Sequence, residues 1–511
     1  MVAKILSCAV LGIEARKVEV EINIQRGTIP AFNIIGLPDP AIRESRDRIK
    51  FAIKNSGFEF PHGKITVNLA PAGIRKVGSA FDLPIAVSIL SASGIIKKDI
   101  SSEYVVCGEL SLDGRLREIK GALPVAVDLR ENKIANLILP ERNMVEVSGV
   151  SGMNIYGFGH LRELVSFLKG EIEKVPQNKK SSSSKGKQNY RIDFRDVKGQ
   201  EHVKRGMEIA ASGGHNILLI GPPGSGKSML AKRLPTILSE MTKDEILETS
   251  KIHSVAGLLS PKKGLIINRP FRNPHHTISD AAFVGGGTNP MPGEISLAHN
   301  GILFLDEFPE FKRNVLELLR QPMEDGKIRI SRVQTTNVYP CRFMLVAAMN
   351  PCPCGYFTDP KKECHCTPYQ IQRYLSRISG PLLDRIDMHL SVPRLNYDEL
   401  SQRRKGDPSE IMRKRVNATR KLQETRYRNE PLLFNAHLES KDIEKYCSID
   451  KEAEELLKMA ILELGISARA YDKILKVART IADLEEKETI EAGHISEAIS
   501  YRSLDRDFWM T

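Results

Sequence analysis

The chain has 511 residues, and 41% of them are apolar, which predicts about three domains of ordinary size, each with its own core. The formal net charge of +12 is typical of proteins with a polyanionic partner such as nucleic acid, although a solvated basic surface and a basic linker give the same balance. No stretch approaches the ~18 apolar residues of a membrane helix, so we expect no membrane partner.

The eight cysteines do not fit a secreted disulfide framework, because four of them crowd between Cys352 and Cys366 and the others are scattered. A reducing, cytoplasmic location fits better. Residues 1–13 have the look of a weak signal peptide. However, residues 17–22 alternate polar and apolar side chains, and no small-residue cleavage site follows, so we interpret this segment as the first strand.

The order of predicted elements divides the chain into an α/β domain, an ATPase-like core and a helical region. Residues 1–170 mix predicted strands (64–69, 135–139) with predicted helices (41–55, 82–93). Residues 171–190 are predicted to be a flexible basic linker, because 179–188 contain no apolar residue.

The second domain is predicted over residues 191–396. It contains continuous apolar runs at 217–220, 302–305 and 343–347, which are typical of parallel strands buried on both faces. Residues 397–511 are predicted to form a helical lid, because 452–464, 470–484 and 492–502 carry apolar side chains at helical spacing. The predicted fold class is therefore α/β with a parallel sheet at the centre.

A phosphate-binding loop follows the first of these strands. It fits the pattern G-x-x-x-x-G-K-[ST] and consists of Gly221, Pro222, Pro223, Gly224, Ser225, Gly226, Lys227 and Ser228. A helix predicted at 229–234 follows it, so backbone N–H groups and the helix N-terminus face the phosphates of ATP. We expect Lys227 to reach the β- and γ-phosphates and Ser228 to ligate magnesium.

The two later strands end in polar residues that complete a nucleotide site. Asp306 is predicted to position magnesium and Glu307 to polarise the attacking water, the alternative being an ordinary helix N-cap. Asn350, at the tip of the third strand, is a candidate sensor of the γ-phosphate, the alternative being a capping asparagine. The residues alone therefore predict a magnesium-dependent ATP hydrolase.

Several long motifs resemble the YifB/ComM family of magnesium-chelatase-like AAA+ ATPases. They lie at 285–287, 292–299, 301–307, 319–324 and 348–355. The resemblance runs along nearly the whole chain. It implies a homohexameric DNA helicase that drives branch migration in natural transformation or recombination, with ATP and Mg²⁺ as cofactors and single-stranded or branched DNA as partner.

The resemblance also implies two arginine roles. Arg385, in the segment 379–387, would be the arginine finger that reaches ATP in the neighbouring subunit, with Arg377 as fallback. Without the resemblance, a salt-bridge cluster of Arg385 with Asp384 and Asp387 is favoured. Arg469, at a helix start, would contact the nucleotide from the lid, the alternative being a solvated arginine, which the helix dipole disfavours there.

Two segments resemble the insertions by which this family touches DNA. The first, 269–292, is rich in Gly, Pro and His, and we assign His275 and His276 in it a structural or nucleotide-adjacent role in preference to metal binding. The second contains 327–333, whose alternation predicts a hairpin strand with one basic face that grips phosphates in a pore. An ordinary amphipathic edge strand is the alternative.

The crowded cysteines predict a structural zinc site. Cys352, Cys354, Cys364 and Cys366 form two C-x-C pairs, and four thiolates can surround one zinc tetrahedrally. The usual spacing is C-x-x-C, and His365 is a possible substitute ligand. We expect about one zinc per chain, closing the loop after Asn350.

The first domain resembles a Lon-protease domain without its catalytic pair. Ser79 matches the nucleophile only if one residue is deleted, since Phe81 otherwise occupies that place, and the catalytic lysine position falls on Leu123. Lys120 is three residues away. A serine without a base is a poor nucleophile, so we expect no peptidase activity. A chelatase ATPase subunit, an active protease and an ATP-driven protein remodeller remain the alternatives to a DNA motor.

Overall fold

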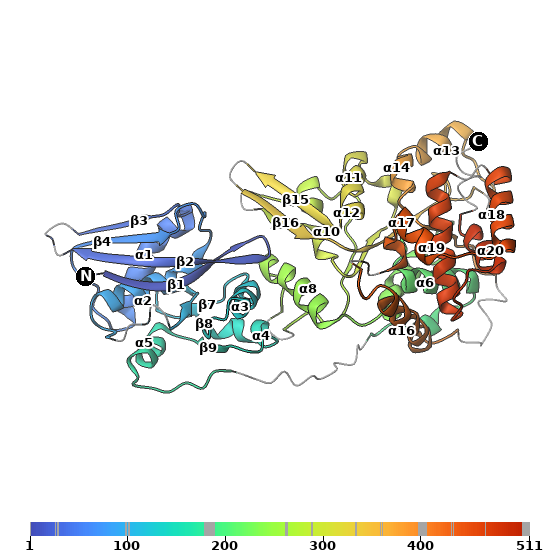
Figure 1. The fold of residues 1–511 in the computed structure, drawn as a ribbon. Coiled ribbons are helices and arrows are strands. Elements are labelled where there is room, and N and C mark those ends of the chain that lie inside the picture. The colour runs from blue at the N-terminus through green and yellow to red at the C-terminus, as the bar shows by residue number, and fades with distance from the viewer. Residues whose placement is uncertain are drawn as a thin grey trace.

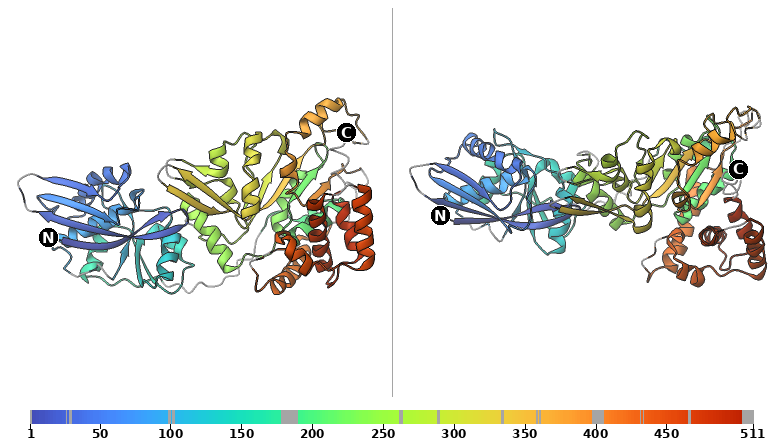
Figure 2. Two further views of the ribbon diagram at one scale, coloured as in Figure 1. Left: turned by 45° about the horizontal axis from the view of Figure 1, so that its top comes forward. Right: turned by 90° about the horizontal axis from the view of Figure 1, so that it is seen from above.

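The computed structural model describes residues 2–25, 27, 30–97, 100, 103–177, 190–260, 264–287, 290–332, 335–357, 359, 361–396, 406–430, 432, 434–464 and 467–502. The segment 179–188, on which the linker prediction rests, lies outside the described residues. Figures 1 and 2 show three parts in a row: an α/β domain, a central parallel-sheet core and a group of C-terminal helices. Within the described residues, no helix is both long enough and apolar enough to cross a bilayer.

The first domain is built on a seven-stranded mixed sheet in the order β3-β4-β2-β1-β5-β8-β9. Its strands are β1 (Val2–Leu11), β2 (Glu14–Gln25), β3 (Ala31–Ile35), β4 (Lys64–Ala70), β5 (Val105–Val106), β8 (Asn136–Pro140) and β9 (Asn154–Phe158), and a small ribbon pairs β6 (Glu109–Leu110) with β7 (Leu116–Arg117). The predicted alternation along 17–22 is confirmed, because Val18, Val20 and Ile22 are fully buried.

The helices of this domain are α1 (Pro40–Asn55), α2 (Asp82–Ala92), α3 (Ala122–Glu131), α4 (Met144–Val147) and α5 (Leu161–Lys169), with short 3-10 turns η1 (Ser79–Phe81) and η2 (Glu141–Asn143). Helix α1 begins after Asp39, whose carboxylate accepts the N–H of Ile42 at 2.9 Å, a typical N-cap. Residues 171–177, the first part of the predicted linker, lie against this domain. The Gln177 N–H donates to Ile155 O, and Lys174 pairs with Glu163 at 2.6 Å.

The central core contains a five-stranded, all-parallel sheet in the order β11-β14-β17-β10-β18. Its strands are β10 (Ile217–Ile220), β11 (Phe271–Arg272), β14 (Ile302–Leu305), β17 (Met344–Met349) and β18 (Met388–Ser391). Two ribbons flank it: β12 (Gly285–Gly286) with β13 (Met291–Pro292), and β15 (Lys327–Arg332) with β16 (Thr335–Pro340). Every residue of β10, β14 and β17 is buried, as predicted for strands covered on both faces.

Apolar clusters fill both faces of this sheet, and the helices of the core pack around it. These helices are α6 (Glu201–Gly213), α7 (Lys227–Arg233), α8 (Lys243–Ala256), α9 (Asp280–Val284), α10 (Glu294–Leu297), α11 (Arg313–Glu317), α12 (Arg320–Asp325), α13 (Pro368–Leu375) and α14 (Gly380–Leu383), with 3-10 turns η3 (Phe194–Asp196), η4 (Leu234–Thr236) and η5 (Phe308–Glu310). Helix α8 starts with a complete capping box between Thr242 and Glu245.

The C-terminal part is helical, as predicted. Its elements are α16 (Ser409–Arg426), η6 (Asn435–His437), α17 (Ser440–Tyr446), α18 (Lys451–Leu464), α19 (Ala468–Leu484) and α20 (Ala492–Ser500). Helix α19 shares one apolar core with α6 and β10 of the central domain. At the end of α19, Asp483 is buried and pairs with both Arg426 and Arg479. Because a buried charge is stable only when it is paired, this network fixes α16 against α19.

The first domain contacts the central core through α3, α4 and α8. The Gly121 N–H, just before α3, donates to Ser254 O on α8 at 3.2 Å, and Ser254 Oγ donates to Glu146 on α4. The tip of the β1–β2 hairpin also reaches the core, where Ile13 packs on the apolar cluster beneath β15. The two domains are thus joined by hydrogen bonds as well as by the chain.

Candidate functional site

The phosphate-binding loop lies at the carboxyl end of β10, between that strand and α7. Gly224 and Gly226 have φ values of +77° and +94°, a left-handed conformation that favours glycine. The glycines of the sequence pattern are therefore required by the backbone conformation of the loop. Helix α7 begins at Lys227, two residues earlier than predicted, and it points its free N–H groups into the loop.

Lys227 is held at the mouth of this loop. Its Nζ donates to Gly221 O at 2.6 Å, to Pro222 O at 3.0 Å and to Asn350 Oδ1 at 3.1 Å. Burial lowers the pKa of Lys227 to about 8, and the nearby charge of Asp306 only partly opposes this effect. All three acceptors are uncharged, so phosphate oxygens would be stronger partners for the ammonium group.

The two residues predicted to hold magnesium touch each other. Ser228 Oγ donates to Asp306 Oδ2 at 2.6 Å, and the other oxygen of Asp306 accepts the N–H of Glu307 at 3.0 Å. A hydroxyl and a carboxylate beside a phosphate loop are the oxygen ligands that Mg²⁺ takes from proteins, the remaining ligands being phosphate and water. The arrangement therefore suits a magnesium nucleotide.

Glu307 occupies a strained position next to Asp306. Its φ is +53°, which is uncommon for a residue with a side chain, and its carboxylate is 62% exposed. It precedes η5 without capping it through its side chain, so the helix-cap alternative is not realised. His276 Nδ1 lies 3.3 Å from Glu307 Oε2, and the His276 ring packs against Phe311. The sequence placed His276 near the nucleotide but gave no sign of this partner.

Asn350 follows β17 directly, at the same sheet edge as the loop. Its side-chain oxygen accepts from Lys227 instead of capping a helix. Arg394, which the sequence did not single out, also reaches this edge. It follows β18, its Nη2 donates to Pro223 O at 3.4 Å, and its Nε pairs with the buried carboxylate of Asp359 at 3.4 Å. No local sequence pattern marks it, because only the position of β18 beside β10 brings Arg394 to this edge.

The three candidate arginines all pair with carboxylates of their own chain. Arg385 contacts Glu324 and donates to Pro381 O at 2.5 Å, so the alternative, a salt-bridge cluster with Asp384 and Asp387, does not form around it. Arg469 pairs with Asp384 at 3.0 Å, and the fallback Arg377 pairs with Glu310 at 2.8 Å. The single chain does not bring Arg385 or Arg469 to the phosphate loop, and their nucleotide roles stay predictions.

Asp387, the other acid of this segment, is part of a buried cluster. Burial alone would raise its pKa, but Lys473 at 3.4 Å and His215 hold the pKa of Asp387 below its ordinary value. The Asn216 N–H also donates to it at 2.9 Å. Because Asn216 precedes β10 and Lys473 lies on α19, Asp387 ties the C-terminal helices to the sheet of the nucleotide site.

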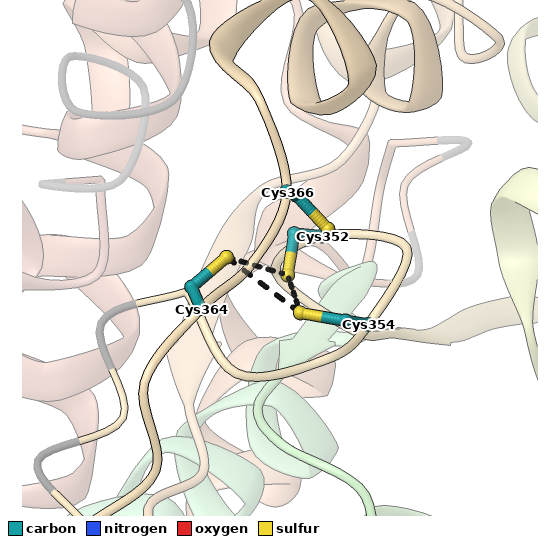
Figure 3. Close-up of side chains that lie close together, drawn as sticks. All are labelled: Cys352, Cys354, Cys364 and Cys366. Atoms are coloured by element: carbon teal, nitrogen blue, oxygen red, sulfur yellow. Dashed lines mark hydrogen bonds between the residues drawn. The ribbon is translucent and has the colours of Figure 1, made fainter.

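The four cysteines meet just beyond Asn350 (Figure 3). The Cys352 sulfur lies 3.3 Å from that of Cys354 and 3.6 Å from that of Cys364, and all four sulfurs lie within 4.8 Å of one another. Tetrahedral zinc with Zn–S bonds of about 2.3 Å separates its sulfurs by about 3.8 Å, so the group fits one ion. The Cys352 sulfur also accepts two backbone N–H groups, which stabilise a thiolate. His365 is not a member of the group.

The predicted hairpin is present, with β15 paired to β16. Ile328 and Ile330 are 6% and 5% exposed and face the core, whereas Lys327, Arg329 and Ser331 face the other way. Val333 lies outside the described residues. The ribbon thus has one apolar and one basic face, and it is a hairpin of its own and not an edge strand of the main sheet.

Ser79 borders a cavity of about 530 Å³ between the first domain and the core, and Lys120 lines the same cavity. The Ser79 hydroxyl donates to the carboxylate of Glu109. Leu123 is buried, and its N–H donates to Glu146 at 3.1 Å. The Ser79 hydroxyl is thus bonded to a carboxylate, and the expected lack of peptidase activity stays a prediction.

Comparisons with known proteins cover nearly the whole chain. The family model "Magnesium chelatase, subunit ChlI" matches residues 193–400, "Subunit ChlI of Mg-chelatase" matches 20–143, and "Magnesium chelatase, subunit ChlI C-terminal" matches 406–502. The chain is 45% identical to "Uncharacterized protein YifB" of Salmonella typhimurium, covering 98% of this chain and 96% of that protein.

It is also 43% identical to "Competence protein ComM" of Haemophilus influenzae, over 99% of this chain and 98% of that protein. Lon protease 2 of Bacillus subtilis is 26% identical over 26% of each chain. Two relatives of this identity, aligned from end to end, together with the three family models, show the family. The chain belongs to the YifB/ComM family of magnesium-chelatase-like AAA+ ATPases.

Proposed function

We propose that this protein is a ring-forming, magnesium-dependent ATPase that translocates on DNA and acts as a helicase or branch-migration factor, as a homohexamer, in natural transformation or recombination. Lys227, Ser228, Asp306 and Asn350 bind and sense the nucleotide, and Glu307 polarises the attacking water. In the ring, Arg385 reaches ATP in the next subunit and Arg469 contacts it from the lid.

The observation that carries the proposal is that Lys227, Ser228, Asp306 and Asn350 meet at one edge of the parallel sheet. Lys227, from the loop after β10, contacts Asn350 after β17, and Ser228 contacts Asp306 after β14. Three strands thus deliver a cation, a metal-binding pair and a polar sensor to one place, which is what phosphoryl transfer to water requires.

The DNA substrate is supported by the basic hairpin, by the net charge and by the relative named for competence. Arg329 projects from the exposed face of β15, where a ring would present it to a strand in its pore. A chelatase-type subunit is the second candidate, because the three matching family models carry that name. A protein remodeller without a DNA substrate would use the same motor.

The test is the steady-state ATPase rate with and without single-stranded and branched DNA. Lys227→Ala is expected to abolish turnover, and Glu307→Gln to lower kcat by a factor of about 10²–10⁴ while nucleotide still binds. Lys232→Ala, on the exposed side of α7, is the matched control and keeps the rate. Arg329→Ala is expected to keep the DNA-free rate and to lose most of the DNA stimulation.

The outcomes separate the candidates. DNA stimulation that disappears in Arg329→Ala supports a DNA motor. An ATPase rate that DNA leaves unchanged contradicts the DNA proposal while leaving the ATPase intact, and it moves the assignment to the chelatase or the remodeller. We further propose that Cys352, Cys354, Cys364 and Cys366 hold one zinc ion that closes the loop after Asn350.

A further inference from the structure

A groove at the outer end of the first domain lies far from the nucleotide site. It has a volume of about 780 Å³ and is bordered by β3, by the segment before β4 and by one side of α1. Figures 1 and 2 place β3 and α1 at the end of the domain that faces away from the central core. Neither the family's nucleotide chemistry nor the pore hairpin uses this region.

Aromatic rings form one wall of the groove. Phe32 on β3 and Phe60 before β4 lie nearly parallel, with ring centroids 6.4 Å apart and an angle of 23° between the planes. Both rings are only half-buried, and Phe58 lines the same groove. Flat, partly exposed rings in parallel are a surface on which nucleic-acid bases stack, since every base has a π-face.

Three cations line the same groove. Arg46, Lys50 and Lys54 follow one another at intervals of four residues on α1, so they lie along one side of that helix, and all three are exposed. Within the part of the chain that the structure describes, Lys50 and Lys54 form no ion pair. Arg46 has only a long contact of 3.9 Å with its neighbour Asp47, in solvent.

Two acidic residues, Asp47 and Glu59, also border the groove, so its net charge is modest. The cations, however, form a row along one side of α1 and do not cluster at a single point. A row of positive charges in the same groove as stacked rings matches a single strand of nucleic acid, whose phosphates run beside its bases. A duplex hides its bases and would leave the rings unused.

We propose that this groove, defined by Phe32, Phe60, Arg46, Lys50 and Lys54, binds single-stranded nucleic acid. The inference deepens the proposed function by giving the first domain a substrate contact of its own. A strand held by the groove and by the motor at once would be bound far more tightly than by either alone, because the second contact becomes intramolecular.

The test uses the full chain without nucleotide and a fluorescent oligodeoxythymidylate of about 16 nucleotides, with anisotropy as the readout. Lys50→Glu with Lys54→Glu is expected to weaken binding by at least about tenfold and to reduce the slope of log K against log salt by about 1.4, for two phosphate contacts. Both residues are exposed, so the fold is preserved. Lys133→Glu with Arg142→Glu, two exposed cations of the same domain, is the matched control and should bind as the wild type.

A second pair of variants tests the stacking. Phe32→Leu with Phe60→Leu keeps apolar volume but removes the π-faces, and a loss of about tenfold in affinity is expected. The same sequence as a duplex is expected to bind more weakly than the single strand. Equal binding of the duplex, or unchanged affinity in both groove variants, would overturn the proposal. Tighter binding of a polyglutamate peptide than of the oligonucleotide would overturn it as well, by assigning the groove to an acidic protein segment.

The test of the groove can fail or succeed independently of the proposed DNA motor. If the groove variants lose affinity while DNA fails to stimulate ATP hydrolysis, the groove proposal is supported and the DNA-motor proposal is contradicted. If affinity is unchanged while stimulation persists in the wild type, the motor stands and the groove is not its contact. The DNA-free ATPase rate is expected to stay unchanged in every groove variant, because the groove residues lie outside the nucleotide site.

Discussion

The folded protein disfavours the charged form of Lys227. Burial lowers its pKa to about 8, and its three hydrogen-bond acceptors are neutral. A bound triphosphate would supply the opposite charge that the folded chain lacks, and so raise this pKa again. Nucleotide binding and proton binding at Lys227 are therefore linked.

We predict that nucleotide binding takes up a proton when the pH lies near or above 8, and that affinity falls as pH rises further. The sign follows because the free protein binds the proton less tightly than the complex does. Calorimetric titration of a non-hydrolysable ATP analogue in buffers of different ionisation enthalpy measures the uptake. Lys227→Arg stays charged at this pH and should bind without it. Equal proton uptake in that variant would assign the proton to another group.

At this scale the sequence predicted well wherever a motif fixes the chemistry. The contact of Ser228 with Asp306 and that of Lys227 with Asn350 both join residues that the sequence had singled out. His276 and Arg394 were not tied to their partners, because each contact joins segments that are far apart in the chain. No local pattern marks such a pair, since only the sheet order brings it together.

Among the elements, those with a continuous apolar run or a clear helical period were predicted, and the pieces inside the segment 269–292 were not. Strand β17 was expected at 343–347 and runs from Met344 to Met349, so that Asn350 follows it directly. Inside 269–292 the structure has β11, α9, β12 and β13, each between two and five residues long. Such pieces are too short to show a period and are stabilised by tertiary contacts.

The described residues of the loop that carries the cysteines contain no helix or strand. Two C-x-C pairs converge within 4.8 Å there, so an ion would add order to the loop. This loop begins just after Asn350 and precedes α13. An ordered loop would therefore help to hold Asn350 in its position beside Lys227. Removing the metal is therefore expected to lower ATP turnover as well as stability.

We predict about one zinc per chain in the purified protein, measured by atomic emission, and its loss in Cys354→Ser with Cys364→Ser. The double variant should also show faster amide exchange in α13 and a lower kcat. His365→Ala is the matched control: it lies between two of the cysteines but outside the cluster, and it should keep the metal. Wild-type protein free of metal, or a double variant that retains it, would contradict the zinc assignment.

For the whole molecule, the question is how the outer groove is linked to the motor. The sequence divided the chain into domains, but it gave no sign of the joint between them, because the joint consists of hydrogen bonds and apolar contacts between residues that are far apart in the chain. Glu146 lies at its centre. It accepts the N–H of Leu123 at 3.1 Å and the hydroxyl of Ser254, so it bonds to both domains.

Burial raises the pKa of Glu146, although Ser254, Asn143 and Leu123 all donate to it. A group whose folded pKa is raised stabilises the folded state most at low pH, and this contribution is lost as pH rises through the folded pKa. The contribution of Glu146 to the joint should accordingly be larger in mildly acidic than in alkaline solution.

We predict that Glu146→Ala loosens the joint, because it leaves the Leu123 N–H and the Ser254 hydroxyl without their acceptor, at a cost of about 1–3 kcal/mol. Hydrogen exchange should quicken in α3 and α8, more so at mildly acidic pH, while α19 keeps its protection. Glu141→Ala, exposed and five residues away, should leave exchange unchanged.

If the groove holds the strand that the motor pulls, DNA stimulation of hydrolysis should fall in Glu146→Ala although the DNA-free rate does not. Unchanged exchange in α8 would show that the apolar contacts of the hairpin tip carry the joint instead.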